Sequence, residues 1–205
     1  GREKEKALID RTIEHLEQEQ PVRTMGLSEE EQRQLVGFGL LSGKPLLTLV
    51  NQAEEGFDGN PPTALVEAVG LGGEVLAISG KIEMDITELP LEEQPEFLAS
   101  LGLTESARDR FVRSAYALLD LISFLTMGPD ESRAWPIRRN TTAQKAAGRI
   151  HSDIERGFIR AEVIPCELLI ELGGEKQARD AGKLRLEGKE YIVRDGDVIT
   201  FRFNV

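Results

Sequence analysis

The chain opens with hydrophobic positions at helical spacing. Within residues 3–19, Ile9, Ile13 and Leu16 recur at i, i+4 and i+7, which predicts a helix with a narrow apolar stripe. A helix this short is marginal in water by itself, so we expect the stripe to pack against a partner helix that precedes Gly1 in a longer chain. A second helix is predicted from a capping box at Ser28 to about residue 41.

Two runs of consecutive apolar residues follow, at 46–50 and 74–78, and both are typical of strands buried on both faces. The segment 61–70 between them predicts a helix capped by Asn60. Strand, helix and strand make a βαβ unit, whose right-handed crossover makes the two strands parallel. Because ligands bind beyond the carboxyl ends of such strands, the residues after each strand are candidates for a binding site.

Two more helices are predicted at 91–101 and 104–119, the second burying Phe111 and Ala115. From residue 121 the pattern changes to short alternating strands, predicted at 121–127, 132–138, 158–164, 184–187, 190–193 and 198–204. Short helices at 142–150 and 166–181 lie among them, and Gly188 and Gly196 are expected to supply the positive φ of tight turns. Strands wrapped around one main helix predict a β-grasp-like α+β module.

The charge distribution separates the same two regions. Residues 1–118 contain 11 basic and 22 acidic side chains, a net charge of −11, whereas residues 119–205 contain 14 of each. Because so acidic a chain repels phosphate, any nucleic-acid site has to be a local cluster of Lys and Arg, and DNA binding is not expected. No membrane span or secretion signal is visible, so a cytoplasmic protein is expected.

The residues needed for phosphoryl transfer are missing from these 205 positions. No Gly-Lys pair stands in the context of a P-loop, and no Asp-x-x-Gly occurs to hold Mg²⁺. The single cysteine, Cys166, excludes an internal disulfide and a Cys-rich zinc site, and it is interpreted as a packing residue.

The strongest candidates for binding chemistry follow the two parallel strands. They are Asn51, Gln52 and Glu54 after the first strand, and Ser79 and Gly80 after the second. In GTPase-like domains these two loops hold the base, and an Asn-Lys-x-Asp sequence reads guanine. Here Glu54 replaces the aspartate, and an asparagine amide can pair with the N6 and N7 edge of adenine, so adenine is the expected base. The alternative is that Asn51 is a turn residue after a strand.

A larger set of motifs resembles a known family. They are Arg133-Ala134-Trp135, Ala146-Ala147-Gly148, Ile150 to Asp153, Gly157 to Val163, Asp180 to Arg185, Asp195 to Ile199 and Phe203-Asn204-Val205. Together they resemble the TGS domain of the YchF-type ATPases, which are Obg-related members of the translation-factor class of GTPases. Gln52, Gly80 and Asn140 depart from that family, which usually has an apolar residue, alanine and glycine there.

The resemblance implies both the fold and the function. Residues 1–42 would be the returning half of a helical-hairpin insertion, 43–118 the C-terminal part of a parallel-sheet P-loop GTPase-like domain, and 119–205 a TGS β-grasp domain. The full-length parent would be a ribosome-associated ATPase that binds ATP in preference to GTP, with Mg²⁺. The chain would be a fragment without the P-loop half, inactive and without a cofactor when alone.

A basic cluster in the second region is the candidate RNA-binding surface. Its members are Arg133, Arg138, Arg139, Lys145, Arg149, Arg156 and Arg160. With Asp153 and Glu155 the segment 133–160 has a net charge of 7 − 2 = +5 in a region that is neutral overall. The resemblance favours RNA. The alternative is ordinary surface charge paired with acids of residues 167–190.

Two other residues are interpreted as structural. His151 is expected to end a helix and to hydrogen-bond locally, because no nucleophile or metal ligand accompanies it. Trp135 is expected in the core. Two functions therefore compete, a portion of an ATPase that carries the base-reading loops, and an autonomous β-grasp adaptor that binds RNA or protein without nucleotide. A P-loop upstream of Gly1 would distinguish them.

Overall fold

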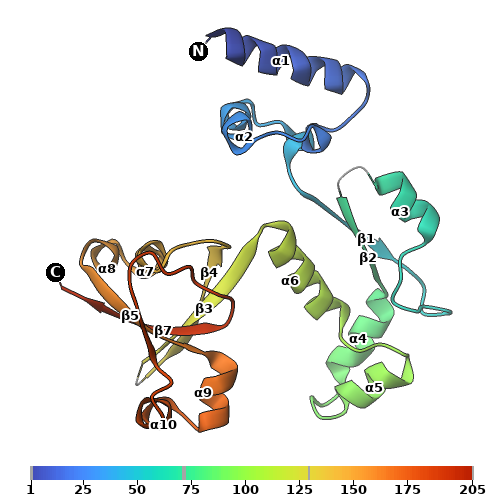
Figure 1. Ribbon diagram of the computed structural model, residues 1–205. Helices are drawn as coiled ribbons and strands as arrows, with labels where there is room; N and C mark the ends of the chain where they lie inside the picture. Colours follow the sequence, from blue (N-terminus) through green and yellow to red (C-terminus); the bar gives the residue numbers. More distant parts are fainter. Residues whose placement is uncertain (1, 71–72, 129, 205) are drawn as a thin grey trace. The chain divides into compact units, whose positions relative to one another are not determined.

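The chain folds as two compact units, with the division between Leu118 and Leu119 (Figure 1). The computed structural model describes residues 2–70, 73–128 and 130–204. The predicted fold class, an α/β portion followed by an α+β module, is confirmed. No helix in those described ranges combines the length and hydrophobicity needed to cross a membrane.

A helical segment forms the start of the first unit. Its elements are α1 (Arg2–Glu17), η1 (Val22–Thr24), α2 (Glu29–Leu35), η2 (Val36–Phe38) and η3 (Leu41–Gly43). The capping box is confirmed, because the Ser28 hydroxyl accepts from the Glu31 N–H and the Glu31 carboxylate accepts from the Ser28 N–H. Gly39 adopts φ +62° and ends the helical turns before residue 41, which makes this helix shorter than predicted.

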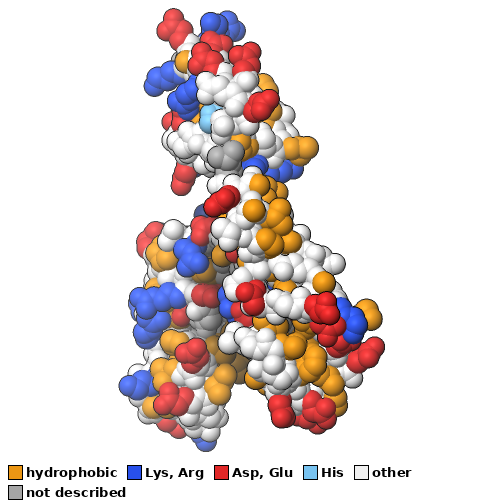
Figure 2. Space-filling view, turned by 90° about the vertical axis from the view of Figure 1, so that its right-hand side faces the viewer, with side chains coloured by type: hydrophobic (Ala, Val, Ile, Leu, Met, Phe, Trp, Pro, Cys, Tyr) orange, Lys and Arg blue, Asp and Glu red, His pale blue; other side chains and the backbone are white. Residues whose placement is uncertain are grey.

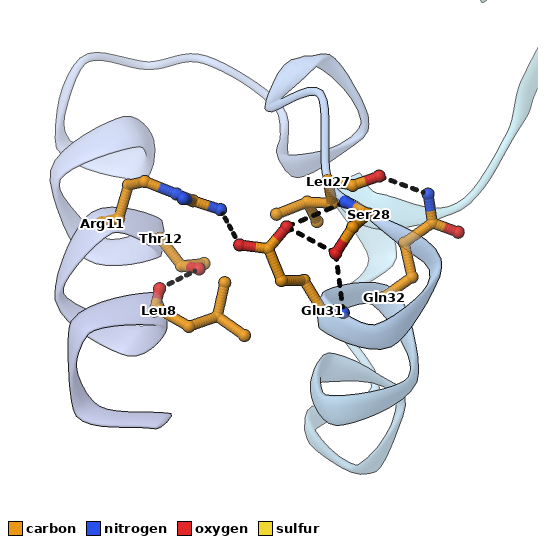
Figure 3. Close-up of polar contacts among 7 residues, drawn as sticks. All are labelled: Leu8, Arg11, Thr12, Leu27, Ser28, Glu31 and Gln32. Carbon is orange, nitrogen blue, oxygen red and sulfur yellow. Dashed lines mark hydrogen bonds and ion pairs between the residues drawn. The ribbon is translucent and has the colours of Figure 1, made fainter. Parts of the chain in front are cut away.

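The described residues do not cover the predicted apolar stripe of α1, and its packing against a preceding helix stays a prediction. Ile13 and Leu16 are 49% and 39% exposed, and the buried side chains of α1 are Leu8 and Thr12. The reason is that the chain after α1 folds back, so that Leu8 packs in a small core with residues of η1 and α2. An ion pair of 2.6 Å between Arg11 Nη2 and Glu31 Oε1 fixes this contact (Figure 3).

The predicted βαβ unit is present. It consists of β1 (Leu46–Asn51), α3 (Thr63–Val69) and β2 (Gly73–Ile78), and the strands are parallel with Asn51 opposite Ile78. The prediction of burial on both faces is wrong for β1, because the described residues form a sheet of only two strands and Leu49 remains 44% exposed. Asn60 is not the helix cap, since Pro62 occupies that position.

Three helices complete the first unit: α4 (Gly80–Glu88), α5 (Gln94–Ser100) and α6 (Ala107–Leu118). The sequence did not predict α4, which buries only two apolar residues, Ile82 and Ile86. The α6 helix begins later than predicted, because the Ser106 hydroxyl accepts from the Asp109 N–H at 3.1 Å. Phe111 is 41% exposed, so its predicted burial is wrong.

The second unit is a five-stranded sheet in the order β4-β3-β7-β5-β6. The elements are β3 (Leu121–Met127), β4 (Ser132–Arg138), α7 (Ala143–Ile150), α8 (Ser152–Arg156), β5 (Phe158–Pro165), α9 (Cys166–Leu172), α10 (Glu175–Asp180), β6 (Arg185–Glu187) and β7 (Asp197–Phe203). The main core lies on the sheet face that packs against α7, where Phe124, Val163 and Ile199 meet Ala143 and Ala146.

Three local predictions in this unit are wrong. Residues 190–193 form no strand and contribute an isolated bridge from Ile192 to Thr142. The helix predicted at 166–181 is broken into α9 and α10 by Gly173 and Gly174, whose φ angles are +84° and +129°. Gly196 has the expected positive φ of +75°, but Gly188 is outside the positive-φ region.

Candidate functional site

Asn51 and Gly80 meet at the carboxyl ends of β1 and β2. The Asn51 Oδ1 atom accepts a hydrogen bond of 3.0 Å from the Gly80 N–H. The Asn51 side-chain NH₂ has no hydrogen-bond partner among the described residues, so it can donate to a ligand. A side-chain amide oxygen has two lone pairs, so the contact with Gly80 leaves one that can accept from N6 of adenine, and the NH₂ group suits the N7 acceptor. The bidentate adenine contact stays a prediction.

Gln52 points along its own loop in the structure. Its backbone N–H donates to the Ile78 carbonyl at 2.8 Å, which extends the pairing of β1 and β2 by one residue. Its side-chain Nε2 donates to the Asn60 carbonyl at 3.0 Å. Gln52 therefore closes the loop 52–60 onto itself.

Glu54 lies near a lysine that sequence reasoning left out of the site. The Lys81 ammonium is 3.8 Å from the Glu54 carboxylate and 2.9 Å from the Asp85 carboxylate. Asp85 first, and Glu54 to a lesser degree, raise the pKa of Lys81 above its ordinary value. The signal that could have found Lys81 is its position directly after Ser79-Gly80. The Glu54 carboxylate therefore has a cation beside it within the protein.

Ser79 and Gly80, predicted as a loop, connect β2 directly to α4, with Ser79 as the N-cap and Gly80 as the first residue of the helix. Ser79 is 1% exposed and its hydroxyl is buried without a hydrogen-bond partner among the described residues. A Cβ on Gly80 would lie 3.5 Å from Asn51 Oδ1, which is ordinary van der Waals contact. Alanine, the usual family residue, would therefore fit here, and glycine is not required by the contact.

The residues present suit one end of a nucleotide. Asn51 and Gly80 are in contact and Glu54 lies beside Lys81, which directly follows Gly80, whereas the sequence offers no P-loop for a triphosphate. Within the described ranges, no group of three or more His, Cys, Asp or Glu side chains could hold a metal ion. ATP would therefore be held here by its base alone, and no described residue cluster fits Mg²⁺.

The structure separates the predicted basic cluster. Ile137 packs on the sheet face that carries α7, and because side chains alternate along a strand, Arg138 lies on the opposite face. Lys145 and Arg149 are on α7 itself, and Arg160 is on β5. Basic and acidic side chains are interspersed over the face shown in Figure 2. The seven residues therefore do not form one basic face.

Several members of the cluster are neutralised. Arg139 pairs with Asp120 at 3.1 Å, Lys145 with Glu155 at 2.8 Å, and Arg156 with Asp153. These acids belong to residues 120–155, so the expected partners from 167–190 are wrong. The Arg133 guanidinium lies 4.4 Å from the centre of the Trp135 ring. Exposed members without an ion pair among the described residues are Arg133, Arg138, Arg149 and Arg160, and of these Arg133 has the ring contact.

The structural interpretations of His151 and Trp135 are confirmed. His151 caps α8, since its Nδ1 accepts from the Asp153 N–H at 3.1 Å. Trp135 is partly buried against the main core, and its indole N–H donates to the Thr126 hydroxyl at 2.9 Å. Cys166 is partly buried at the second core of the unit.

The fold and the paired loops define the class of protein. A parallel βαβ unit with Asn51 after one strand and Ser79-Gly80-Lys81 after the next matches the C-terminal part of a P-loop GTPase-like domain. The solved structure of the YchF GTPase of Schizosaccharomyces pombe superimposes with a TM-score of 0.84 at 31% identity. The match covers 98% of this chain and 55% of that one.

Sequence comparisons name the family. Residues 121–204 match the family model YchF-GTPase_C, described as a protein of unknown function (DUF933). Proteins named Ribosome-binding ATPase YchF from Haemophilus influenzae and Bacillus subtilis are each 43% identical over 203 residues, covering 98% and 97% of this chain. The resemblance to the YchF family is confirmed over nearly the whole chain. The chain spans 56% of the length of these two relatives.

Proposed function

We propose that this chain is the portion of a ribosome-associated, nucleotide-binding ATPase that carries the base-reading loops and the β-grasp module. The observation that supports this most directly is the hydrogen bond from the Gly80 N–H to Asn51 Oδ1. It links the two loops that hold the base in GTPase-like domains and leaves the Asn51 NH₂ group to donate to a purine. The hydrolysis of ATP, with Mg²⁺, would require a phosphate-binding half that is not among these residues.

The expected preference for ATP over GTP follows from the acid at position 54. Reading guanine requires a carboxylate that accepts from the ring N–H and the 2-amino group, and adenine has neither donor. Glu54 is one methylene longer than the aspartate of guanine-reading loops, and Lys81 lies beside its carboxylate. A carboxylate so placed gives guanine little advantage, whereas the Asn51 amide can pair with the N6 and N7 edge of adenine.

The ribosome is the proposed partner of the β-grasp module. The bacterial relatives are named ribosome-binding ATPases. The exposed guanidinium groups with neither an ion pair nor a ring contact among the described residues, at Arg138, Arg149 and Arg160, are suited to phosphates of ribosomal RNA. A cytoplasmic location would follow from this partner.

The change Asn51→Asp tests the proposal. Aspartate keeps the oxygen that accepts from Gly80 but replaces the donor NH₂ by a second acceptor, so the loop geometry is preserved while base reading is lost. We expect ATP affinity of the full-length protein to fall about tenfold or more, measured by equilibrium titration. Asn60→Asp is the matched control, because it adds the same charge to the same loop while only the backbone of Asn60 contacts Gln52.

The outcome separates the two candidate functions. An autonomous adaptor would bind ribosomal RNA equally well with and without ATP, and its ATP affinity would be absent or equal in both variants. That result would contradict the base-reading role of Asn51.

A further inference from the structure

Arg110 on α6 reaches the main chain of two separate segments. Its Nη1 donates to the Gly59 carbonyl at 2.7 Å, and its Nη2 donates to the Ala77 carbonyl at 2.9 Å. Gly59 lies near the end of the loop that begins at Asn51, and Ala77 lies two residues before Ser79. One side chain therefore connects the loop that follows β1 to strand β2.

The Ala77 carbonyl needs such a partner because of its place in the sheet. The next carbonyl, that of Ile78, accepts from the Gln52 N–H and so points toward β1. Successive carbonyls of a strand point in opposite directions, so the Ala77 carbonyl points to the other edge of β2. Among the described residues no strand pairs with that edge, and the Arg110 guanidinium satisfies the carbonyl there.

The Gly59 end of the loop is tightly held. Gly59 has φ +81°, and a Cβ at this position would lie 2.9 Å from the Leu103 side chain. The neighbouring carbonyl of Asn60 accepts from Gln52 Nε2 at 3.0 Å. The loop 52–60 is thus closed by Gln52 on one side and attached to α6 and β2 by Arg110 on the other.

An ion pair does not account for Arg110. No carboxylate pairs with it among the described residues, and its Nε is buried without a hydrogen-bond partner. A guanidinium group is planar and rigid, and its two terminal nitrogens donate hydrogen bonds in fixed directions. Lysine has a single ammonium group and cannot do this. The contacts that it makes are those needed to set the distance between a loop and a strand.

We infer that Arg110 is a positioning residue for the base-reading site. It holds the loop 52–60 against β2, and so keeps Asn51 and Gly80 in hydrogen-bond distance while a base is bound. This inference rests on the proposed function, since it assigns Arg110 to the same nucleotide site. Arg110 does not contact the base, so its effect on binding has to pass through the loop.

Hydrogen exchange on the 205-residue chain tests the positioning step without nucleotide. We expect Arg110→Met to raise the exchange rates of amides in residues 53–60 about tenfold or more, because two charge-assisted hydrogen bonds to the loop and strand are lost. The matched control is Arg113→Met on the same helix, whose side chain is 72% exposed and pairs with Glu105. Unchanged exchange in residues 53–60 would overturn the inference.

Equilibrium titration of the full-length protein with ATP and with GTP tests the consequence for binding. Arg110→Met should weaken ATP about tenfold and bring the ratio of the two affinities toward one, whereas Arg113→Met should change neither. A merely structural role would lower stability without changing that ratio. If the unaltered protein binds ATP and Arg110→Met binds it equally well, the inference fails while the proposed function stands. If the unaltered protein binds no nucleotide, the proposed function itself fails.

Two further variants cover the case in which Arg110→Met does not fold. Arg110→Lys keeps the charge and can reach only one carbonyl, so a smaller change in the same direction is expected in both measurements. Gly59→Ala acts from the loop side and should reproduce the loss of ATP preference, because alanine is strained at φ +81° and its Cβ would lie 2.9 Å from the Leu103 side chain. ATP preference unchanged in both variants would overturn the inference.

Discussion

Asn51 uses its side-chain oxygen inside the protein and keeps its NH₂ group for a ligand. This division matters because an asparagine that reads a base must itself be held in place, and the Gly80 N–H does so. The sequence placed the two residues at the carboxyl ends of parallel strands as candidates for one binding site, and the structure brings them into hydrogen-bond contact. Their role in reading a base stays a prediction.

The first residue-scale prediction concerns base preference. In the full-length protein, Glu54→Asp together with Gln52→Lys should shift the preference from ATP toward GTP. The shorter carboxylate restores the guanine-reading acid, and the change at position 52 releases the Asn60 carbonyl. Competitive titration of the two nucleotides measures the shift. Stronger GTP than ATP binding by the unaltered protein would remove the argument.

The second residue-scale prediction concerns Gly157. A Cβ at this position would collide with the backbone carbonyl of Asn204, and neither backbone can easily move because Asn204 also donates its N–H to the Gly157 carbonyl at 2.9 Å. Gly157→Ala should therefore destabilise the second unit by about 1–3 kcal/mol. The control is Gly188→Ala, where a Cβ meets nothing within 4 Å and φ is not positive. Urea denaturation of both variants should separate them.

At the scale of elements, α2 shows that a capping box read from four residues can predict where a helix begins. The Ser28 capping box forms as the sequence indicates, and the same Glu31 carboxylate also binds Arg11 of α1 (Figure 3). One side chain thus caps one helix and attaches another. The α1 helix shows the opposite case, because its helical spacing was correct while the face that this chain buries, at Leu8 and Thr12, was not predicted.

The element-scale prediction is a pH dependence. The Ser28 backbone N–H, and after it the Arg11 guanidinium, lower the pKa of the Glu31 carboxyl below its ordinary value of 4.5. A lowered folded-state pKa stabilises the folded protein above pH 4.5, and this contribution is lost as the pH falls through the folded-state pKa. Glu31→Gln should therefore be less stable than the unaltered chain at pH 7. Urea denaturation at a series of pH values should show the difference shrinking below pH 4.5, and a constant difference would contradict the assignment.

At the scale of the whole molecule, an acidic unit and a charge-balanced unit share one chain. The balanced unit holds the exposed arginines that remain without an ion pair among the described residues. Its ion pairs, such as Lys145 with Glu155, reduce the number of cations available to phosphate. Of the seven proposed RNA contacts, Arg138, Arg149 and Arg160 are therefore the ones that we retain.

The whole-molecule prediction concerns salt dependence of ribosome or ribosomal RNA binding. Arg138→Ala and Arg149→Ala should each weaken binding and flatten the slope of log affinity against log salt concentration by about one unit. Arg156→Ala, whose guanidinium pairs with Asp153, is the control and should change the slope less. Filter binding at several salt concentrations measures these slopes. Binding that is insensitive to salt and to both changes would show that the arginines are ordinary surface charge.

The sequence by itself determined the features that depend on neighbouring residues. The parallel βαβ unit, the Ser28 cap, the strands at 121–127 and 132–138 and the loops after β1 and β2 all follow from spacing and residue type over a few positions. These signals are reliable because each depends on residue types within a short stretch of sequence. The family motifs could be recognised because they too are short runs of residues.

Only the tertiary structure decided which surfaces meet. Packing against η1 and α2 selected the Leu8 face of α1, and alternation along β4 placed Arg138 away from α7. Arg110 donates to the carbonyl of Gly59, 51 residues away in the sequence, and no sequence pattern predicts such a contact. The physical reason is that burial and long-range hydrogen bonds depend on which segments the folded chain brings together. The spacing of residues along the sequence does not specify which distant segments lie side by side in space.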